Sequence, residues 1–273
     1  MKKKRDKAQN IDFSFLDRPE ILSLVFHPRR QAVKDPEVTE IFVPVTESIQ
    51  ISCRWHFTDK DAPTILFFHG NGEIASDYDD LAPAFNKLGL NFFVADYRGY
   101  GQSDGSPTWT GMAQDAHTIF SYLTSFLKEK EYTPDLIVMG RSLGSASAIE
   151  IASHYGHQLK GVIIESGFAH TYQLIRRLGV PQSYLPSDRE HEVSNLEKIK
   201  EVNISILIIH AQNDQIIPLQ DAKDLYSNVT TADEDKELFI IPQADHNTIL
   251  YFGFEEYFRA LKNFILMLKS LDA

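Results

Sequence analysis

The stretch Leu136-Ile137-Val138-Met139-Gly140-Arg141-Ser142-Leu143-Gly144-Ser145-Ala146-Ser147-Ala148 decides how the rest of the sequence is interpreted. It consists of an apolar, β-branched run, then Gly-x-Ser-x-Gly, then small residues. A serine on a sharp strand-to-helix turn has a strained backbone, so the residues two places before and after it must be small. Gly140 and Gly144 occupy those places. Without such flanks the motif also fits a tight turn with an incidental serine, but this context predicts that Ser142 is a nucleophile.

Eight runs rich in β-branched and aromatic residues predict strands at 40–45, 49–57, 64–68, 91–95, 135–139, 161–164, 204–209 and 238–241. A short turn separates the first two runs, as in an antiparallel pair, whereas helix-like segments separate the later ones and force parallel crossovers. Several later runs are apolar throughout, as expected when helices cover both faces of a sheet. The predicted fold class is α/β, a mostly parallel eight-stranded sheet with helices on both faces.

The spacing of apolar residues predicts helices at 77–87, 109–130, 145–155, 219–227 and 254–269. A chain of 273 residues fits one α/β domain over 1–273. We expect 1–30 to be an N-terminal extension. Residues 168–203, with two prolines and a charged cluster at 188–192, are longer than an ordinary connection and predict a short cap insertion.

Composition excludes some functions and locations. With 27 Lys+Arg against 38 Asp+Glu, the formal charge of -11 would repel nucleic-acid phosphate, so we expect no nucleic-acid partner. The single cysteine, Cys53, excludes a disulfide framework, fits a reducing compartment and predicts a cytoplasmic location.

Membrane association is a separate question. The apolar runs are too short to span a bilayer, and the basic start at 2–5 is not followed by the apolar core of a signal peptide. Residues 11–30 mix apolar and basic side chains, so they either contact a membrane surface peripherally or pack on the domain.

Two further residues complete a catalytic triad with Ser142. Asp214 follows the predicted strand at 204–209, and His246 follows the last predicted strand. The required chain order is serine, acid, histidine, and of the ten histidines only His246 follows both other residues. The alternatives are that Asp214 and His246 are ordinary surface-loop residues. Asp104 precedes Ser142, which is the wrong order for the acid.

A second motif, His69-Gly70-Asn71-Gly72-Glu73, follows the predicted strand at 64–68. This position supplies one donor of an oxyanion hole, and we assign the two donors to the backbone N–H groups of Asn71 and Leu143. His69 also precedes the nucleophile, so we interpret it as structural. Arg141 needs a partner for its charge, either Asp104 or Glu165.

These two motifs and the run Asp96-Tyr97-Arg98-Gly99-Tyr100-Gly101-Gln102-Ser103-Asp104-Gly105-Ser106-Pro107 resemble the α/β-hydrolase superfamily of serine hydrolases over nearly the whole chain. In motif the chain is most similar to the lineage that includes protein depalmitoylases and bacterial hydrolases of unknown substrate. The resemblance implies cleavage of esters or thioesters of a small or acylated substrate. An amidase or peptidase and a non-catalytic binding protein are the alternatives. No metal or organic cofactor is expected, because metal-ligand spacing and dinucleotide fingerprints are missing from the sequence.

Overall fold

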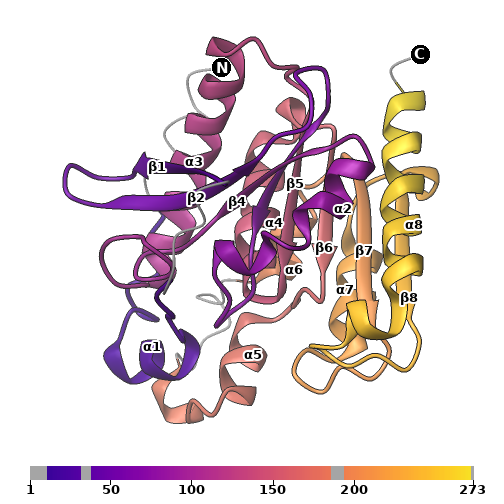
Figure 1. The fold of residues 1–273 in the computed structure, drawn as a ribbon. Helices are drawn as coiled ribbons and strands as arrows, with labels where there is room; N and C mark the ends of the chain where they lie inside the picture. Colours follow the sequence, from indigo (N-terminus) through magenta and orange to yellow (C-terminus); the bar gives the residue numbers. More distant parts are fainter. Residues whose placement is uncertain (1–10, 32–37, 186–193, 272–273) are drawn as a thin grey trace.

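An eight-stranded sheet forms the centre of the computed structural model, which describes residues 11–31, 38–185 and 194–271 (Figure 1). The strand order is β1-β2-β4-β3-β5-β6-β7-β8. The β1–β2 and β2–β4 pairs are antiparallel, and the other neighbouring pairs are parallel. The predicted fold class is therefore confirmed. The strands are β1 (Thr39–Pro44), β2 (Gln50–His56), β3 (Thr64–Phe68), β4 (Asn91–Ala95), β5 (Leu136–Arg141), β6 (Gly161–Glu165), β7 (Ser205–Ala211) and β8 (Lys236–Ile241).

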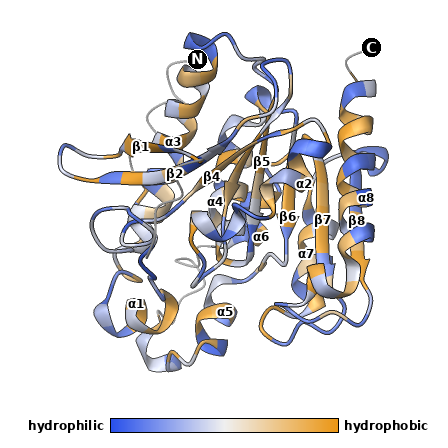
Figure 2. Cartoon of the chain, in the orientation of Figure 1, coloured by the Kyte–Doolittle hydropathy of each residue, from blue (hydrophilic) through white to orange (hydrophobic). Residues whose placement is uncertain are grey.

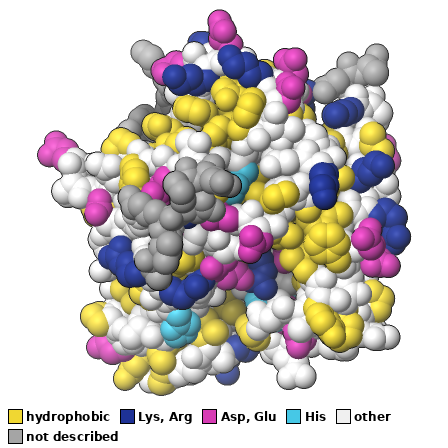
Figure 3. All heavy atoms as spheres, in the orientation of Figure 1, with side chains coloured by type: hydrophobic (Ala, Val, Ile, Leu, Met, Phe, Trp, Pro, Cys, Tyr) yellow, Lys and Arg dark blue, Asp and Glu magenta, His cyan; other side chains and the backbone are white. Residues whose placement is uncertain are grey.

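Helices cover both faces of the sheet because the strands are apolar on both sides (Figure 2). Within β5, Val138 belongs to one apolar cluster, whereas Ile137 and Met139 belong to the other. On the face of the molecule that Figure 3 shows, charged side chains of both signs are scattered between hydrophobic ones. One face carries α3 (Trp109–Glu129), α4 (Ser145–Tyr155), α6 (Asn195–Ile199) and α7 (Leu219–Asn228), and the other carries α2 (Ala82–Lys87) and α8 (Ile249–Ser270).

The helices differ from the sequence prediction in three ways. The predicted helix at 77–87 is a 3-10 turn, η2 (Ala75–Tyr78), followed by α2, and α8 begins at Ile249 rather than 254. Gly253 has non-helical φ/ψ angles and kinks α8 near its start. Short helices α1 (Pro19–Val25), α5 (Thr171–Arg177) and α6 were not predicted, because helices this short depend on tertiary packing rather than on propensity.

The predicted N-terminal extension is described from residue 11 onward, and its apolar residues pack on the domain. Leu16, Ile21 and Val25 are fully buried in the core. The carboxylate of Asp17 accepts a hydrogen bond from the backbone N–H of Trp109 at the start of α3 (2.7 Å). Of the two alternatives for residues 11–30, the structure therefore shows packing on the domain. Among the described residues, no helix combines the length and apolarity needed to cross a membrane.

The predicted cap insertion is described over 168–185 and 194–203, and the charged cluster at 188–192 lies outside the described residues. Phe168 is buried in the core, and α5 lies beside α1 beyond the carboxyl ends of the strands (Figure 1). The rings of Phe15 and Tyr172 meet edge to face, 6.5 Å apart, between these two segments. The N-terminal segment and the insertion therefore pack together at the edge of the sheet that carries Ser142.

Cys53 is fully buried in β2. Burial raises the pKa of its thiol well above the usual range, so the reactive thiolate does not form at neutral pH. Cys53 is a packing residue.

Candidate active site

Ser142 lies on a strained turn between β5 and α4. Its φ angle of 52° is in the left-handed region, which non-glycine residues rarely adopt. The turn is also crowded: a Cβ on Gly140 would lie 2.3 Å from the carbonyl oxygen of Gly144, and one on Gly144 would lie 2.1 Å from that of Phe68. Only glycine fits at either place. The turn leaves the Ser142 hydroxyl at the carboxyl edge of the sheet, where the loops after the other parallel strands converge.

The structure brings Ser142, His246 and Asp214 together. The Nε2 atom of His246 lies 2.9 Å from Oγ of Ser142, and its Nδ1 atom lies 2.7 Å from Oδ2 of Asp214. A carboxylate only accepts hydrogen bonds, so Nδ1 carries the proton and Nε2 is free to accept one from the serine. All three residues are buried, with exposed fractions of 6 to 8%. The arrangement is a triad-like relay from carboxylate to imidazole to hydroxyl.

The Asp214 carboxylate is fixed by its own loop. Its Oδ1 atom accepts hydrogen bonds from the backbone N–H groups of Ile216 (3.0 Å) and Ile217 (2.8 Å), which leaves Oδ2 for the histidine. A second buried histidine, His210, uses Nε2 to donate to the Ile217 carbonyl (2.8 Å). Burial lowers the pKa of His210 and favours its neutral form. His210 therefore supports the loop.

The predicted oxyanion-hole loop lies beside this relay and is anchored through Asn71. The side-chain oxygen of Asn71 accepts from the backbone N–H of His27 (3.0 Å) and from the hydroxyl of Tyr100 (2.7 Å), and its side-chain nitrogen donates to the carbonyl of Val25. Leu143 is the second residue of the 3-10 turn η3 (Ser142–Gly144). The assignment of the Asn71 and Leu143 N–H groups as donors to an oxyanion stays a prediction.

His69 has a structural place in this loop. Its ring is fully buried, with Nε2 3.1 Å from Oδ1 of Asp96 and Nδ1 2.8 Å from the carbonyl oxygen of Gly70. The same Asp96 oxygen accepts from the backbone N–H of Ala75 (2.8 Å). His69 thus ties the loop to the end of β4, as expected from its place in the sequence.

Arg141 finds one of the two partners considered from sequence and one that was missed. Its Nε atom donates to Glu165 (3.0 Å), and its Nη1 atom pairs with Glu73. Asp104 instead accepts a hydrogen bond from the backbone N–H of Gln50 (3.0 Å). Glu73 stands next to the His-Gly-Asn-Gly motif, but nothing in the sequence identifies its partner, because the fold alone joins it to Arg141.

Within the described part of the chain, one group of side chains has the residue types that bind metal ions. Ligand atoms of His117, Glu150 and His154 lie within 4.8 Å of one another. The Glu150 carboxylate is already paired with the ammonium of Lys198, 2.5 Å away, and with both imidazoles. The group is accounted for as an ionic network between α3, α4 and α6.

Comparison with known sequences shows similarity to hydrolases. A family model described as serine aminopeptidase, S33 (Hydrolase_4) matches residues 59–181. The chain is 29% identical over 215 residues to the YfhR protein of Salmonella typhi, covering 74% of this chain and 70% of that protein. It is 29% identical over 181 residues to lysophosphatidylserine lipase ABHD12 of Danio rerio, covering 60% of this chain and 46% of the lipase. The chain thus spans less than half the length of the lipase.

Among solved structures, the Pyrococcus furiosus esterase Pf2001 superposes with a TM-score of 0.71 at 19% identity. The match covers 88% of this chain and 98% of the esterase. At this identity the likeness concerns the fold. It covers more of this chain than the 59–181 segment that the family model matches.

Proposed function

We propose that this chain is a serine hydrolase of the α/β-hydrolase superfamily and that it cleaves carboxylic ester or thioester bonds through an acyl-enzyme intermediate. The observation that carries the proposal is the relay itself. The hydroxyl of Ser142 lies within hydrogen-bond distance of an imidazole whose other nitrogen is held by a buried carboxylate. Nucleophile and base within such reach, with the base oriented by a third group, are the signature of covalent catalysis by serine.

The reaction follows from these positions. His246 Nε2 takes the Ser142 proton as Oγ attacks the substrate carbonyl carbon, and the carbonyl π electrons move to oxygen. The backbone N–H groups of Asn71 and Leu143 stabilise that oxyanion. When the intermediate collapses, the bond to the leaving group breaks and His246 returns the proton to the leaving oxygen or sulfur. His246 then takes a proton from a water molecule as the water oxygen attacks the acyl carbon. The bond between that carbon and Oγ of Ser142 breaks, His246 returns the proton to Oγ, and the acid leaves.

Two of the relatives favour esters as the substrate class. One is named as a lysophosphatidylserine lipase and one as an esterase, which supports an acyl ester, including a lipid ester, as the bond that Ser142 attacks. The description of the matching family as a serine aminopeptidase favours amide hydrolysis as a second candidate. Amides have a poorer leaving group, so the two activities separate in a panel of esters, thioesters and aminoacyl amides of the same acyl group.

The test is covalent labelling of the purified protein by a fluorophosphonate, together with this panel. We expect labelling at Ser142 and hydrolysis of esters or thioesters, and loss of both in Ser142→Ala, because only the nucleophilic oxygen is removed. Unfolding by urea should show the same stability for both proteins. Labelling that survives in Ser142→Ala would move the nucleophile elsewhere. A wild-type protein that is neither labelled nor active would favour the non-catalytic binding protein.

A further inference from the structure

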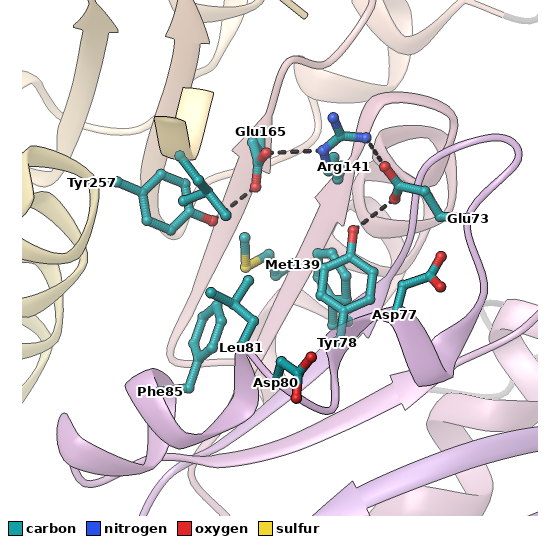
Figure 4. Close-up of a pocket in the computed structure, with 12 residues that line it drawn as sticks. Glu73, Asp77, Tyr78, Asp80, Leu81, Phe85, Met139, Arg141, Glu165 and Tyr257 are labelled. Carbon is teal, nitrogen blue, oxygen red and sulfur yellow. Dashed lines mark hydrogen bonds and ion pairs between the residues drawn. The ribbon is translucent and has the colours of Figure 1, made fainter. Parts of the chain in front are cut away.

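We propose that Arg141 is a positioning residue for this reaction. Its guanidinium joins the loop of His246 and the loop of Asn71 to the turn that carries Ser142. The inference rests on the proposed function of the triad. It adds the residue that holds the segments of Ser142, His246 and Asn71 in position relative to one another. We call Arg141, Glu73, Glu165, Tyr78 and Tyr257 the Arg141 cluster (Figure 4).

Each of the three guanidinium nitrogens of Arg141 has a different acceptor. Nε donates to Oε1 of Glu165 at the end of β6 (3.0 Å), and Nη1 pairs with Glu73 in the loop after β3. Nη2 donates to the backbone carbonyl oxygen of His246 (3.0 Å). Arg141 is also the residue before Ser142, so one side chain links the nucleophile turn directly to the backbone of the histidine.

Glu73 carries the link on to the oxyanion-hole loop. Its Oε2 atom accepts from the backbone N–H of Gly70 (2.7 Å) and from the hydroxyl of Tyr78 (2.6 Å). Gly70 immediately precedes Asn71, whose N–H is the predicted oxyanion donor. A Cβ on Gly70 would lie 2.7 Å from Nη1 of Arg141, so this glycine makes room for the guanidinium. The cluster thus contacts three of the segments that form the proposed site, those of Ser142, His246 and Asn71.

Burial makes these contacts strong and specific. The exposed fractions of the Arg141 and Glu165 side chains are 13% and 7%. Burial by itself would lower the pKa of Arg141, but Glu73, the Tyr78 oxygen and Glu165 raise it above the usual range, so the guanidinium keeps its charge. Burial would likewise raise the pKa of Glu73, but mainly the charge of Arg141 and the Tyr78 hydroxyl bring it below its ordinary value. A hydrogen bond from an ionised donor is about twice as strong as one between neutral groups.

A lysine could not make the same set of contacts. The guanidinium is planar and presents its donors in a fixed fork, whereas an ammonium group is a compact point charge. The three acceptors lie on three different segments, namely the end of β6, the loop after β3 and the loop of His246, and the planar guanidinium reaches each of them through a different nitrogen. Arginine is therefore the residue type that this arrangement requires.

A cavity of about 400 Å³ lies directly against the cluster (Figure 4). Met139, Phe85 and Leu81 contribute apolar walls, and Arg141 and Glu165 are part of its lining. Two other lining residues, Asp77 and Asp80, are exposed, so the cavity reaches the surface. A small guanidinium ion from solvent therefore has a route to the space that the Arg141 side chain occupies.

The experiment compares Arg141→Ala, Arg141→Lys and the wild type on an ester that the wild type hydrolyses. We expect kcat of Arg141→Ala to fall about 10²-fold, the scale of a misplacement near 1 Å. KM should change by less than about threefold, because the lost interaction acts on the catalytic groups rather than on bound substrate. Arg141→Lys keeps the charge and should lose kcat with KM unchanged, which tests the idea even if the alanine variant does not fold.

Chemical rescue separates positioning from general stability. Ethylguanidinium, at concentrations below those that unfold the protein, should restore a measurable part of kcat to Arg141→Ala, whereas ethylammonium should not. Arg98→Ala is the matched control, because Arg98 is also a half-buried arginine with two bonds to a carboxylate, Asp115 (2.7 Å each), and is not bonded to the triad. It should lose stability but keep kcat, with no response to either ion.

These experiments distinguish a failure of the positioning role of Arg141 from a failure of the proposed hydrolase function. If the wild type neither hydrolyses the panel nor reacts with the fluorophosphonate, the function fails before Arg141 is tested. If the wild type is active, a folded Arg141→Ala with kcat within about twofold of wild type would overturn the positioning role. So would equal rescue by ethylammonium, no rescue of a folded variant, or a normal kcat in Arg141→Lys.

Discussion

Two buried ionic clusters lie on opposite sides of the sheet, and they use similar chemistry for different ends. The Arg141 cluster surrounds a guanidinium with two carboxylates. The second, the Glu150 cluster, surrounds a carboxylate with His117, His154 and Lys198. Both include a tyrosine hydroxyl, that of Tyr257 at Glu165 (2.7 Å) and that of Tyr155 at His117 (2.9 Å).

The clusters differ in the backbone that they contact. Arg141 and Glu73 bond to the His246 carbonyl and the Gly70 N–H, which belong to loops of the proposed active site. The Glu150 cluster connects side chains of α3, α4 and α6. A buried ion pair is by itself weak evidence for stability, because desolvation offsets much of its attraction. What the cluster contacts, rather than its charge, should therefore decide whether a substitution changes rate or stability.

The largest effect should come from a triad member, which sets the scale for the Arg141 cluster. Asp214→Asn should cut kcat by up to about 10⁴-fold, because an amide no longer holds His246 in the tautomer that accepts the Ser142 proton. Steady-state kinetics on an ester measures the loss, and circular dichroism checks the fold. If Asp214→Asn loses no more than Arg141→Ala, Asp214 is not the acid. Near-normal turnover would place the acid elsewhere.

The second-largest predicted effect is a change in the free energy of unfolding, caused by a substitution in the Glu150 cluster. Burial would raise the pKa of Glu150, but mainly His117 and Lys198 lower it from 4.5 to about 2. The pKa of this carboxyl is lower in the folded protein than in the unfolded chain. Such a group stabilises the fold at pH values above the unfolded-state pKa, and this contribution is lost as the pH falls through the folded-state pKa. The shift corresponds to about 3 kcal/mol at neutral pH, present above pH 4.5 and lost between pH 4.5 and 2.

Glu150→Gln tests this half of the comparison. Urea unfolding at pH 7 should show a loss of about 3 kcal/mol, and the difference from wild type should shrink as the pH is lowered below 4.5. The value of kcat, measured where both proteins are folded, should not change. A fall in kcat comparable to that of Arg141→Ala would show that the two clusters do not differ in the proposed way. A stability difference independent of pH would remove the ionic explanation.

The sequence predicts local features of this molecule well and long-range pairings poorly. All eight strands fall within two residues of the predicted bounds, because apolar β-branched runs between turns are a local signal. That Ser142, Asp214 and His246 lie together was predictable, because each follows a strand and because chain order is fixed in this fold. The sequence predicts that the last strand begins at Leu238, whereas β8 begins at Lys236, because its first two residues, Lys236 and Glu237, are charged.

The partner of Arg141 shows what the sequence does not contain. Glu73 lies 68 positions from Arg141, and His246 lies 105 positions away. These residues meet only after β3, β5 and β8 have taken their places in the sheet. No periodicity or motif marks such a contact, and the tie between Asn71 and Val25 is hidden in the same way. Side chains that link loops are therefore the part of the site for which the structure was needed.

The smallest predicted effect is the sharpest test of the comparison, because the same atom is removed from each cluster. Tyr257→Phe takes away the hydroxyl that donates to Glu165, and Tyr155→Phe takes away the hydroxyl bonded to His117. Each loss should destabilise the protein by about 1 kcal/mol, the usual net contribution of one hydrogen bond.

The rates should nevertheless differ between these two variants. Glu165 stands one hydrogen bond from Arg141, which in turn bonds to the backbone of His246, so Tyr257→Phe should lower kcat, by less than about tenfold. Tyr155→Phe should leave kcat unchanged, because the Glu150 cluster connects side chains of α3, α4 and α6 rather than loops of the proposed active site. Urea unfolding and steady-state kinetics on both variants measure the two effects. A fall in kcat for Tyr155→Phe would contradict the comparison, whereas unchanged kcat in both variants would confine the positioning effect to Arg141 itself.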